Sequence, residues 1–310
     1  MKVYRLLPVA LLALFAGCSG DSVSTFVTPT PHAAVRWVNA VPDTIAMDYR
    51  IVDVVTNANE ASVAYRGTSG AYRSVQPGQH HIRVFPASTV AAACNGPSVV
   101  GQVLLDTTAT FTVNHYYTVL HAGYMHAGSS PQHRLIITDD VFPAASAGNV
   151  SIRVANATAA AADVFVTGAI AAGGAVVGPA AFPNLAFGAV SAYTSFATAA
   201  TTPATSSYRV TATAPGTTTP LLVDGLLSVG TAAYAGSTSV PPLDPVGGTQ
   251  QGGSVLTSVV TPPAVAYTLT SSGSASNCPA PGVKTVVSGT TTGAVVTLVD
   301  KNPKDLILGQ

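Results

Sequence analysis

The residue types that most often carry chemistry are sparse in this sequence, and one cysteine among them has a distinctive setting. Cys18 follows the apolar run LLPVALLALF and two small residues, and Lys2 and Arg5 place positive charge ahead of that run. This order of charge, apolar segment and small residues is typical of an export signal. The run is too short to span a bilayer as a helix. The sequence therefore predicts that the chain is exported and cleaved close to Cys18.

Two interpretations of Cys18 follow from this setting. The segment resembles a bacterial lipoprotein signal, in which acyl chains are attached to the cysteine and cleavage makes that cysteine the new N-terminus; several such chains form a stable anchor. The alternative is an ordinary secretory signal in which Cys18 has no special role. We predict the anchor, with residues 1–17 as the signal peptide and residues 18–33 as a tether. Ser19, directly after the cysteine, favours the outer membrane.

Histidine is the next candidate, since imidazole is the commonest transition-metal ligand in proteins. The longest series of closely spaced histidines is His115, His121, His126 and His133. Their spacings of six, five and seven residues match no usual zinc motif. We predict that they are polar residues of loops and strand ends, and we predict no metal site and no cofactor.

Two adjacent carboxylates, Asp139 and Asp140, leave a choice between a calcium site and a structural role. Carboxylate oxygens are preferred calcium ligands. An aspartate at the end of a strand, however, more often accepts hydrogen bonds within a turn. We predict the structural role.

Four aromatic residues leave a similar choice. Trp37, Tyr116, Tyr117 and Tyr124 could form an aromatic surface that binds a sugar or a peptide, and they are the candidate ligand surface of this chain. Burial in a β-sheet core explains their spacing equally well.

The sequence contains none of the short motifs that carry hydrolytic or nucleotide chemistry. The patterns G-x-S-x-G, H-E-x-x-H and G-x-x-x-x-G-K are absent. Glu60 is the only glutamate, which leaves little for hydrolysis by paired carboxylates. We predict a protein without catalytic residues; the alternative is an envelope hydrolase with a His and Asp site in the first half of the chain.

Composition indicates an all-β protein. Charged residues make up only 8% of the chain. Exposed helix faces are normally built from Glu, Lys, Gln and Arg, whereas this sequence is rich in Val, Thr, Ala, Ser, Gly and Pro, in short apolar stretches. Val and Thr favour strands, and Gly and Pro end them. The formal net charge is zero, so there is no electrostatic attraction to nucleic acid.

An internal repeat relates the two halves of the chain. The segments VRWVNA and SIRVANA align with an offset of 117 residues, which pairs Arg36 with Arg153. Further matches follow in the same order with drifting offsets, as insertions in loops would produce. They pair Asn39 with Asn156, Asp48 with Asp163, Gly67 with Gly188, Tyr72 with Tyr193, Arg83 with Arg209, Asp106 with Asp224 and Pro143 with Pro303. One β-domain present twice explains these matches.

The same residues carry a family resemblance. An Arg-x-x-Asn-Ala strand, a Pro-Asp pair, an Asp-aromatic strand, a Gly and Ser turn that ends in Tyr, and an Arg-Val strand follow in that order. This order resembles the bacterial family called domain of unknown function 4397. The first copy reads VRWVNAVPDTIAMDY, GTSGAY and PGQHHIRVF; the second keeps IRVANA, ADVFVTG, FGAVSAY and SYRVTATAPG but lacks the Pro-Asp pair. The resemblance implies tandem copies in a secreted or surface protein and assigns no chemistry.

We expect two tandem immunoglobulin-like β-sandwich domains, because two sheets packed face to face bury strands that alternate in polarity. In the first repeated strand, Val35 and Trp37 would face one way and Arg36 and Val38 the other. The predicted domains are residues 34–143 and 149–303, with a linker at 144–148 and a tail at 304–310.

Charged residues that recur in both copies, namely Arg36, Arg83, Asp48 and Asp106, indicate shared architecture before shared catalysis. We expect an Arg–Asp ion pair inside each domain or at its rim.

Two further cysteines, Cys94 and Cys278, each lie in an insertion of small residues that the other copy lacks. Export places them in an oxidising compartment. An even pair of cysteines leaves a choice between a disulfide that links Cys94 to Cys278 and two free or intermolecularly paired thiols, because the sequence alone does not ensure that the two loops meet.

The function that these expectations favour is that of an exported, lipid-anchored envelope protein with a non-catalytic binding, adhesion or structural role. Its expected partners are the membrane, through the anchor, and an envelope protein or polysaccharide.

Overall fold

The computed structural model describes residues 31–44, 46–87, 103–125, 128–144, 146–168, 176–201, 206–265 and 292–305. These residues contain strands and no helix, so the prediction of an all-β chain is confirmed. Among them there is accordingly no helix long and apolar enough to cross a membrane. Residues 31–310 form one compact unit. Cys18, Cys94 and Cys278 lie outside the described residues, so the lipid anchor and the disulfide stay hypotheses.

Sixteen strands make up the described part of the chain. Those of the first half are β1 (Ala33–Ala40), β2 (Met47–Ile51), β3 (Glu60–Val63), β4 (Arg73–Val75), β5 (Gly78–Pro86), β6 (Leu105–Phe111), β7 (Tyr116–Ala122) and β8 (Arg134–Asp139). Those of the second half are β9 (Asn149–Asn156), β10 (Ala162–Thr167), β11 (Phe182–Leu185), β12 (Thr194–Ala197), β13 (Arg209–Thr213), β14 (Leu221–Leu226), β15 (Val255–Thr261) and β16 (Ala294–Lys301).

These strands form four sheets of four strands each. In the first half, the outer sheet has the order β3-β2-β5-β6 and the inner sheet the order β4-β1-β7-β8. In the second half, the inner sheet has the order β12-β9-β15-β16 and the outer sheet the order β11-β10-β13-β14. Each sheet of the second half therefore has the order of its counterpart in the first half, with every strand number raised by eight.

Strand direction repeats in the same way. β1 pairs with β7 in parallel, and β9 pairs with β15 in parallel, while the other strand pairs are antiparallel. In an immunoglobulin constant domain the first strand lies in the sheet of the second strand. Here β1 lies between β4 and β7 in the opposite sheet, so the observed strand order differs from that arrangement.

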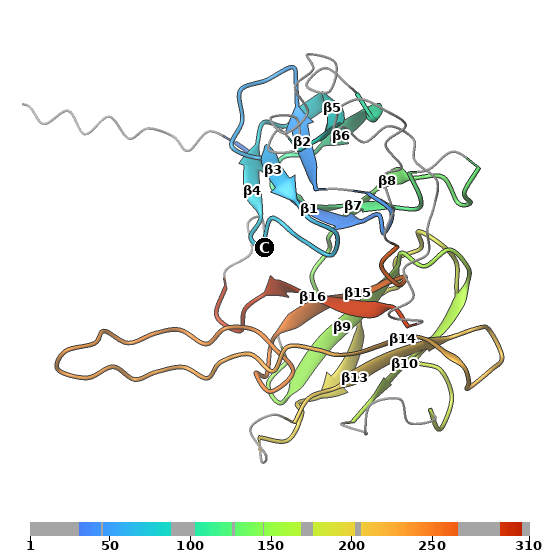
Figure 1. The fold of residues 1–310 in the computed structure, drawn as a ribbon. Coiled ribbons are helices and arrows are strands. Elements are labelled where there is room, and N and C mark those ends of the chain that lie inside the picture. The colour runs from blue at the N-terminus through green and yellow to red at the C-terminus, as the bar shows by residue number, and fades with distance from the viewer. Residues whose placement is uncertain are drawn as a thin grey trace, which may run out of the picture. The chain divides into compact units, whose positions relative to one another are not determined.

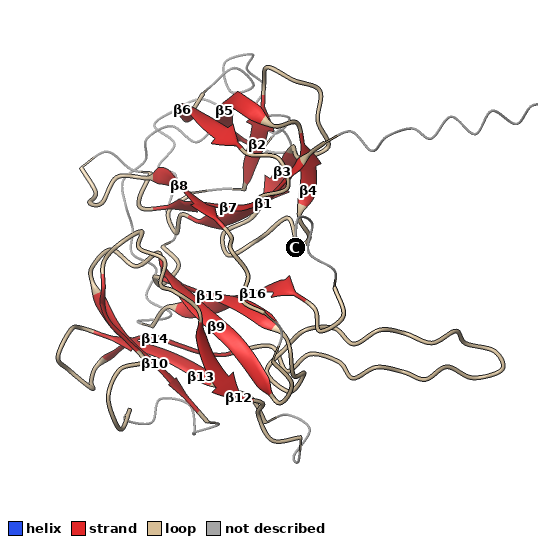
Figure 2. Ribbon diagram, turned by 180° about the vertical axis from the view of Figure 1, so that it is seen from behind, coloured by secondary structure: helices blue, strands red, loops and turns tan. Residues whose placement is uncertain are grey.

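Three clusters of buried apolar side chains separate the four sheets, which lie in layers (Figures 1 and 2). The first cluster fills the space between the two sheets of the first half and contains Trp37 and Tyr49. The second cluster does the same in the second half, around Ile152 and Val164. The third cluster lies between the two inner sheets. Its buried members are Val38, Ala40, Leu120, Ala122, Ala155, Ala157, Val259 and Leu298.

Strand β1 shows how an inner sheet, which is covered on both faces, differs from a sheet with one face in water. Val35 and Trp37 belong to the first cluster, while Val38 and Ala40 on the opposite face belong to the third. The predicted alternation of faces is confirmed, but every residue of β1 is buried. The reason is that a second sheet covers the face that a single pair of sheets would leave in water. Any polar side chain on that face must find partners inside the protein.

Candidate functional site

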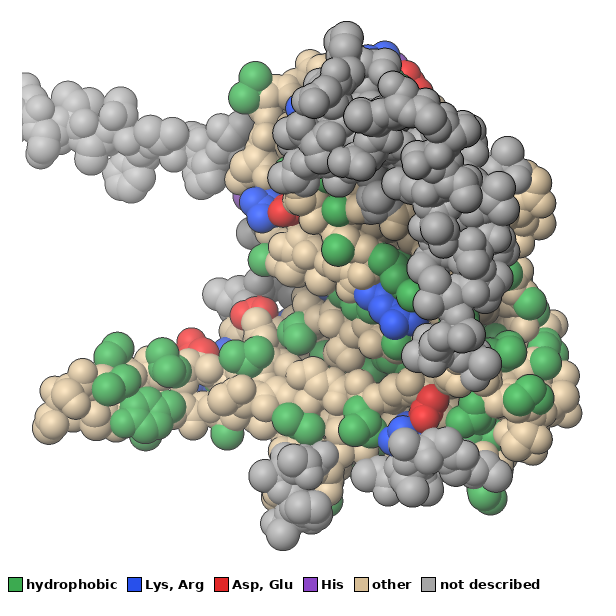
Figure 3. Space-filling view, viewed as in Figure 1, with side chains coloured by type: hydrophobic (Ala, Val, Ile, Leu, Met, Phe, Trp, Pro, Cys, Tyr) green, Lys and Arg blue, Asp and Glu red, His purple; other side chains and the backbone are tan. Residues whose placement is uncertain are grey.

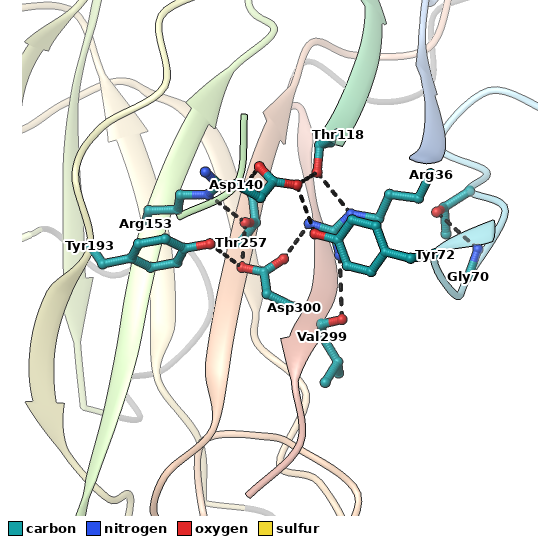
Figure 4. A network of polar contacts seen from close by, with 11 residues as sticks. Arg36, Gly70, Tyr72, Thr118, Asp140, Arg153, Tyr193, Thr257, Val299 and Asp300 are labelled. Atoms are coloured by element: carbon teal, nitrogen blue, oxygen red, sulfur yellow. Dashed lines mark hydrogen bonds and ion pairs between the residues drawn. The ribbon is translucent and has the colours of Figure 1, made fainter. Parts of the chain in front are cut away.

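The largest group of buried charges lies between the two inner sheets (Figure 4). Arg36 on β1 and Arg153 on β9 are the two arginines that the repeat aligns, and each projects from its strand toward the opposite half. Their side chains are 0% and 4% exposed. Burying a charge this fully is costly unless it is paired and hydrogen-bonded. The surroundings of both arginines supply such partners.

Arg36 is bound by groups from both halves of the chain. Its guanidinium forms an ion pair with Asp300 on β16, whose side chain is equally buried. Its Nε donates a hydrogen bond of 2.9 Å to the hydroxyl of Thr118 on β7. The ring of Tyr72 covers its guanidinium, with 4.5 Å between the central carbon and the ring centre.

Arg153 repeats this set of contacts with equivalent residues. It forms an ion pair with Asp140, which directly follows β8. Its Nε donates a hydrogen bond of 2.8 Å to the hydroxyl of Thr257 on β15. The ring of Tyr193 lies 4.7 Å from the guanidinium carbon. Each arginine therefore binds the aspartate of the other half.

The two carboxylates are satisfied from within their surroundings. Asp140 accepts hydrogen bonds from Tyr72 at 2.7 Å and from Thr118 at 2.5 Å. Asp300 accepts hydrogen bonds from Tyr193 at 2.8 Å and from Thr257 at 2.6 Å, so the arrangement has an approximate two-fold relation. We call these eight residues the central network. They are Arg36, Tyr72, Thr118, Asp140, Arg153, Tyr193, Thr257 and Asp300.

Electrostatics keep the two arginines of the central network charged. Burial is the largest single effect on the pKa of Arg36 and would lower it, but Asp300, Tyr72 and Asp140 together outweigh burial and raise the pKa. The pKa of Arg153 is raised in the same way, because Asp140, Tyr193 and Asp300 together outweigh burial. Burial raises the pKa of Tyr72 and of Tyr193. The raised pKa values keep the two guanidinium groups charged and the two tyrosine hydroxyl groups neutral near neutral pH.

The sequence indicated the arginines of this network but not their partners. An Arg–Asp pair inside each half or at its rim was predicted, and it is present: Arg83 binds Asp106 at 2.9 Å, and Arg209 binds Asp224 at 2.6 Å. Arg36 instead binds an aspartate of the other half, 264 residues away in the chain. Asp48 binds Arg50 at 3.0 Å.

The alignment of the repeats marks these partners as recurring positions, although it does not show that they meet. The matched segments LIITDDVFP and VVTLVDKNP place Asp140 opposite Asp300, and the matched turns place Tyr72 opposite Tyr193. With Arg36 and Arg153 these make three aligned polar positions, and a recurring set of this kind is the signal of a shared structural role. Asp140 has the structural role predicted for it, with Arg153 as its charged partner.

Histidines of the first half form a second polar group. His121 on β7 is fully buried, with Nδ1 3.1 Å from the hydroxyl of Tyr49 and Nε2 3.0 Å from Nδ1 of His133. Tyr49 stacks on Trp37, with 5.1 Å between the ring centres. Burial lowers the pKa of His121 to about 3, with a smaller contribution from His133. A buried ring with so low a pKa is a poor general base at neutral pH.

Three further histidines each lie against one aspartate. His80 lies 3.3 Å from Asp53, His115 lies 2.7 Å from Asp139, and His81 lies against Asp106. His126 lies outside the described residues. Within the described part of the chain, no group of three or more His, Cys, Asp or Glu side chains could hold a metal ion.

The four aromatic residues of the candidate ligand surface do not lie on one surface. Trp37 and Tyr117 are buried members of the first cluster, and the indole nitrogen of Trp37 donates to the carbonyl of Ala58 at 2.5 Å. Tyr116 packs at 5.2 Å against Tyr72 on the opposite side of the inner sheet. Tyr124 is half-buried after the end of β7. Core packing therefore accounts for Trp37 and Tyr117. A surface that binds a sugar through all four aromatic rings would need the four side chains to be exposed together.

Part of the chain matches a known protein family. Residues 33–167 match Domain of unknown function (DUF4397). The DUF4397 match runs from the first residue of β1 to the last residue of β10, which is less than half of the chain. It includes Arg36, Tyr72, Thr118, Asp140 and Arg153 of the central network. The family description assigns no activity, and no curated protein matched the chain.

Proposed function

We propose that this protein is an exported, lipid-anchored component of the cell envelope with a non-catalytic structural or binding role. The proposed anchor is Cys18, from the order of charge, apolar run and small residues before it, and the proposed location is the outer membrane. The proposed partners are the membrane, through the lipid, and an envelope protein or polysaccharide.

The proposal of a non-catalytic role rests on the way in which the buried arginines and aspartates of the central network pair with one another. Arg36, Arg153, Asp140 and Asp300 bind one another between the halves, with side chains 0–4% exposed. Groups that neutralise one another in a buried interface are unavailable to a substrate. The alternative of a His and Asp hydrolase gains no support from His121, which is buried and bonded to Tyr49 and His133.

We further propose that the two halves are tandem copies of one β-sandwich domain of the immunoglobulin-like class. The repeated strand order and the repeated contacts of the central network support this proposal. The class is meant broadly, as two facing sheets of mostly antiparallel strands, because the first strand of each half lies beside the seventh. Joined in this way, the copies would act as one rigid spacer or scaffold.

The lipid anchor is testable by labelling. Cells that express the full chain are given an alkyne analogue of palmitate, and the wild-type protein is expected to carry the label and to partition into detergent. Cys18→Ala is expected to lose the label entirely, because no other residue follows the export signal with the chemistry for lipid attachment. Ser19→Ala is the matched control and is expected to keep the label. Equal labelling of Cys18→Ala and wild type would show that Cys18 is not the site.

A further inference from the structure

The second half carries an arm that the first half lacks. Between β6 and β7 the first half has only a tight turn at residues 112–115, whereas residues 227–254 separate β14 from β15. Figure 1 shows most of this segment as a long orange hairpin that projects away from the sheets, and Figure 2 shows the same projection from behind. We call residues 231–246 the arm.

The arm is a hairpin of two extended segments joined by isolated β-bridges, outside the sixteen strands, and its root is closed. The backbones of Thr231 and Val246 exchange hydrogen bonds of 3.0 and 2.9 Å, and those of Tyr234 and Leu243 exchange two of 2.9 Å. At the root, Gly230 has a φ of +78° and touches Gly248 so closely that a Cβ on Gly248 would lie 2.1 Å from the nitrogen of Gly230. The root is therefore fixed, and the arm is built on it as a separate extension.

The arm exposes apolar side chains to solvent, where they contribute nothing to the stability of a single copy of the chain. Tyr234, Val240, Leu243 and Val246 are 42–58% exposed, and Figure 3 shows apolar side chains along the length of the projection. Asp244 is the one charged residue among them. A two-stranded ribbon is marginally stable in water, and three or more strands with an apolar face are needed for independent stability. Among the described residues, no further strand pairs with the arm to cover and stabilise it.

The two edges of the arm differ in their capacity to pair. The strand after the tip contains Pro241, Pro242 and Pro245, which have no backbone N–H to donate. The strand before the tip contains the exposed residues Ala232, Ala233 and Ala235. Within the described part of the chain, no acceptor binds the backbone N–H groups of these three alanines. One edge is blocked and the other is open.

We propose that the arm is a self-association element, in which the open edges of two arms from two copies of this chain pair antiparallel about a two-fold axis. The product is a four-stranded sheet, and four strands exceed the three that independent stability in water requires. Each arm pairs with the same edge of the arm of a second copy, so the interface is isologous. An isologous interface joins two copies and leaves no free edge of the same kind, so the assembly stops at a dimer. The proline-bearing edges lie outermost and stop the growth that an open edge otherwise invites. The proposal is independent of the lipid anchor.

The test measures the mass of residues 31–310, the compact unit that holds all the described strands, by sedimentation and light scattering. The wild type is expected to have twice the mass of one chain at micromolar concentration. Deletion of residues 231–246 joins Gly230 to Gly247 across the closed root, and we expect a monomer with the wild-type circular dichroism spectrum. Ala233→Lys places two like charges at the paired edges and is expected to raise the dimer dissociation constant at least tenfold. Thr238→Lys, which adds the same charge at the tip, is the matched control and should leave that constant within twofold.

Three results would overturn the proposal. A wild type that stays monomeric at about 100 µM, well above the roughly micromolar dissociation constants of many specific complexes, has no self-associating arm. A dimer that survives deletion of the arm uses another surface. A monomer that floats with phosphatidylethanolamine and phosphatidylglycerol vesicles, and ceases to do so after the deletion, assigns the arm to lipid instead of to a second copy.

Discussion

Replacing Asp300 with alanine is expected to lower the free energy of unfolding by about 3–5 kcal/mol, because it leaves the buried charge of Arg36 without its partner. The same change removes the acceptor for the hydroxyl groups of Tyr193 and Thr257. Asp140→Ala makes the equivalent change for Arg153 and is expected to have a similar effect. Urea unfolding followed by circular dichroism, and by the fluorescence of the single tryptophan, Trp37, measures the loss.

Two controls separate the buried pair from a generic loss of charge. Asp106→Ala breaks the ion pair between Arg83 and Asp106, whose side chains are 38% and 41% exposed, respectively. We expect this change to affect the free energy of unfolding little, because exposed ion pairs are screened by solvent. The double variant Arg36→Met with Asp300→Leu removes both charges and is expected to recover much of the stability lost in Asp300→Ala. If Asp300→Ala unfolds at the same urea concentration as Asp106→Ala, the central network does not hold the halves together.

The protein is also expected to lose stability steeply as the pH falls below 6. His121 has a pKa of about 3 in the folded protein, against 6.5 for the free side chain. Because the folded-state pKa is lowered, the neutral ring stabilises the fold fully above pH 6.5, and this contribution is lost between pH 6.5 and 3 as the unfolded chain takes up the proton. At about 1.4 kcal/mol per pH unit, the loss from this one residue is on the order of 5 kcal/mol.

His121→Gln is the variant that isolates this contribution. Glutamine can still donate to or accept from Tyr49 and His133, but it has no proton to take up in this range. Urea unfolding at a series of pH values from 7 to 3 is expected to give a shallower fall in the variant than in the wild type. Parallel slopes for wild type and His121→Gln would contradict the assignment.

Several features of the fold were predictable because they depend on neighbours in the sequence. The all-β class follows from Val and Thr in short stretches between Gly and Pro. The two faces of β1 follow from the period of two in a strand, which places Val35 and Trp37 together and Val38 opposite. The pair of Arg83 with Asp106 follows from the antiparallel pairing of β5 with β6, adjacent strands whose register places the two residues opposite each other.

The central network shows where such reasoning ends. Arg36 and Arg153 were identified from the repeat, yet the predicted partners lay within each half, and the observed partners lie across the interface. A strand pattern shows which side chains share a face, but it does not show which surface will cover that face. For the inner sheets the cover is the other half of the chain.

What the sequence by itself determined is therefore local: strands, their faces, the repeat and the neighbours within a hairpin. The tertiary structure alone decided that both faces of β1 are buried, that Arg36 binds Asp300, and that Trp37 belongs to a core and not to a ligand surface. The physical reason is distance along the chain. Contacts between residues hundreds of positions apart depend on how whole sheets pack, and the free energy of that packing is spread over many apolar side chains whose types alone do not distinguish one partner sheet from another.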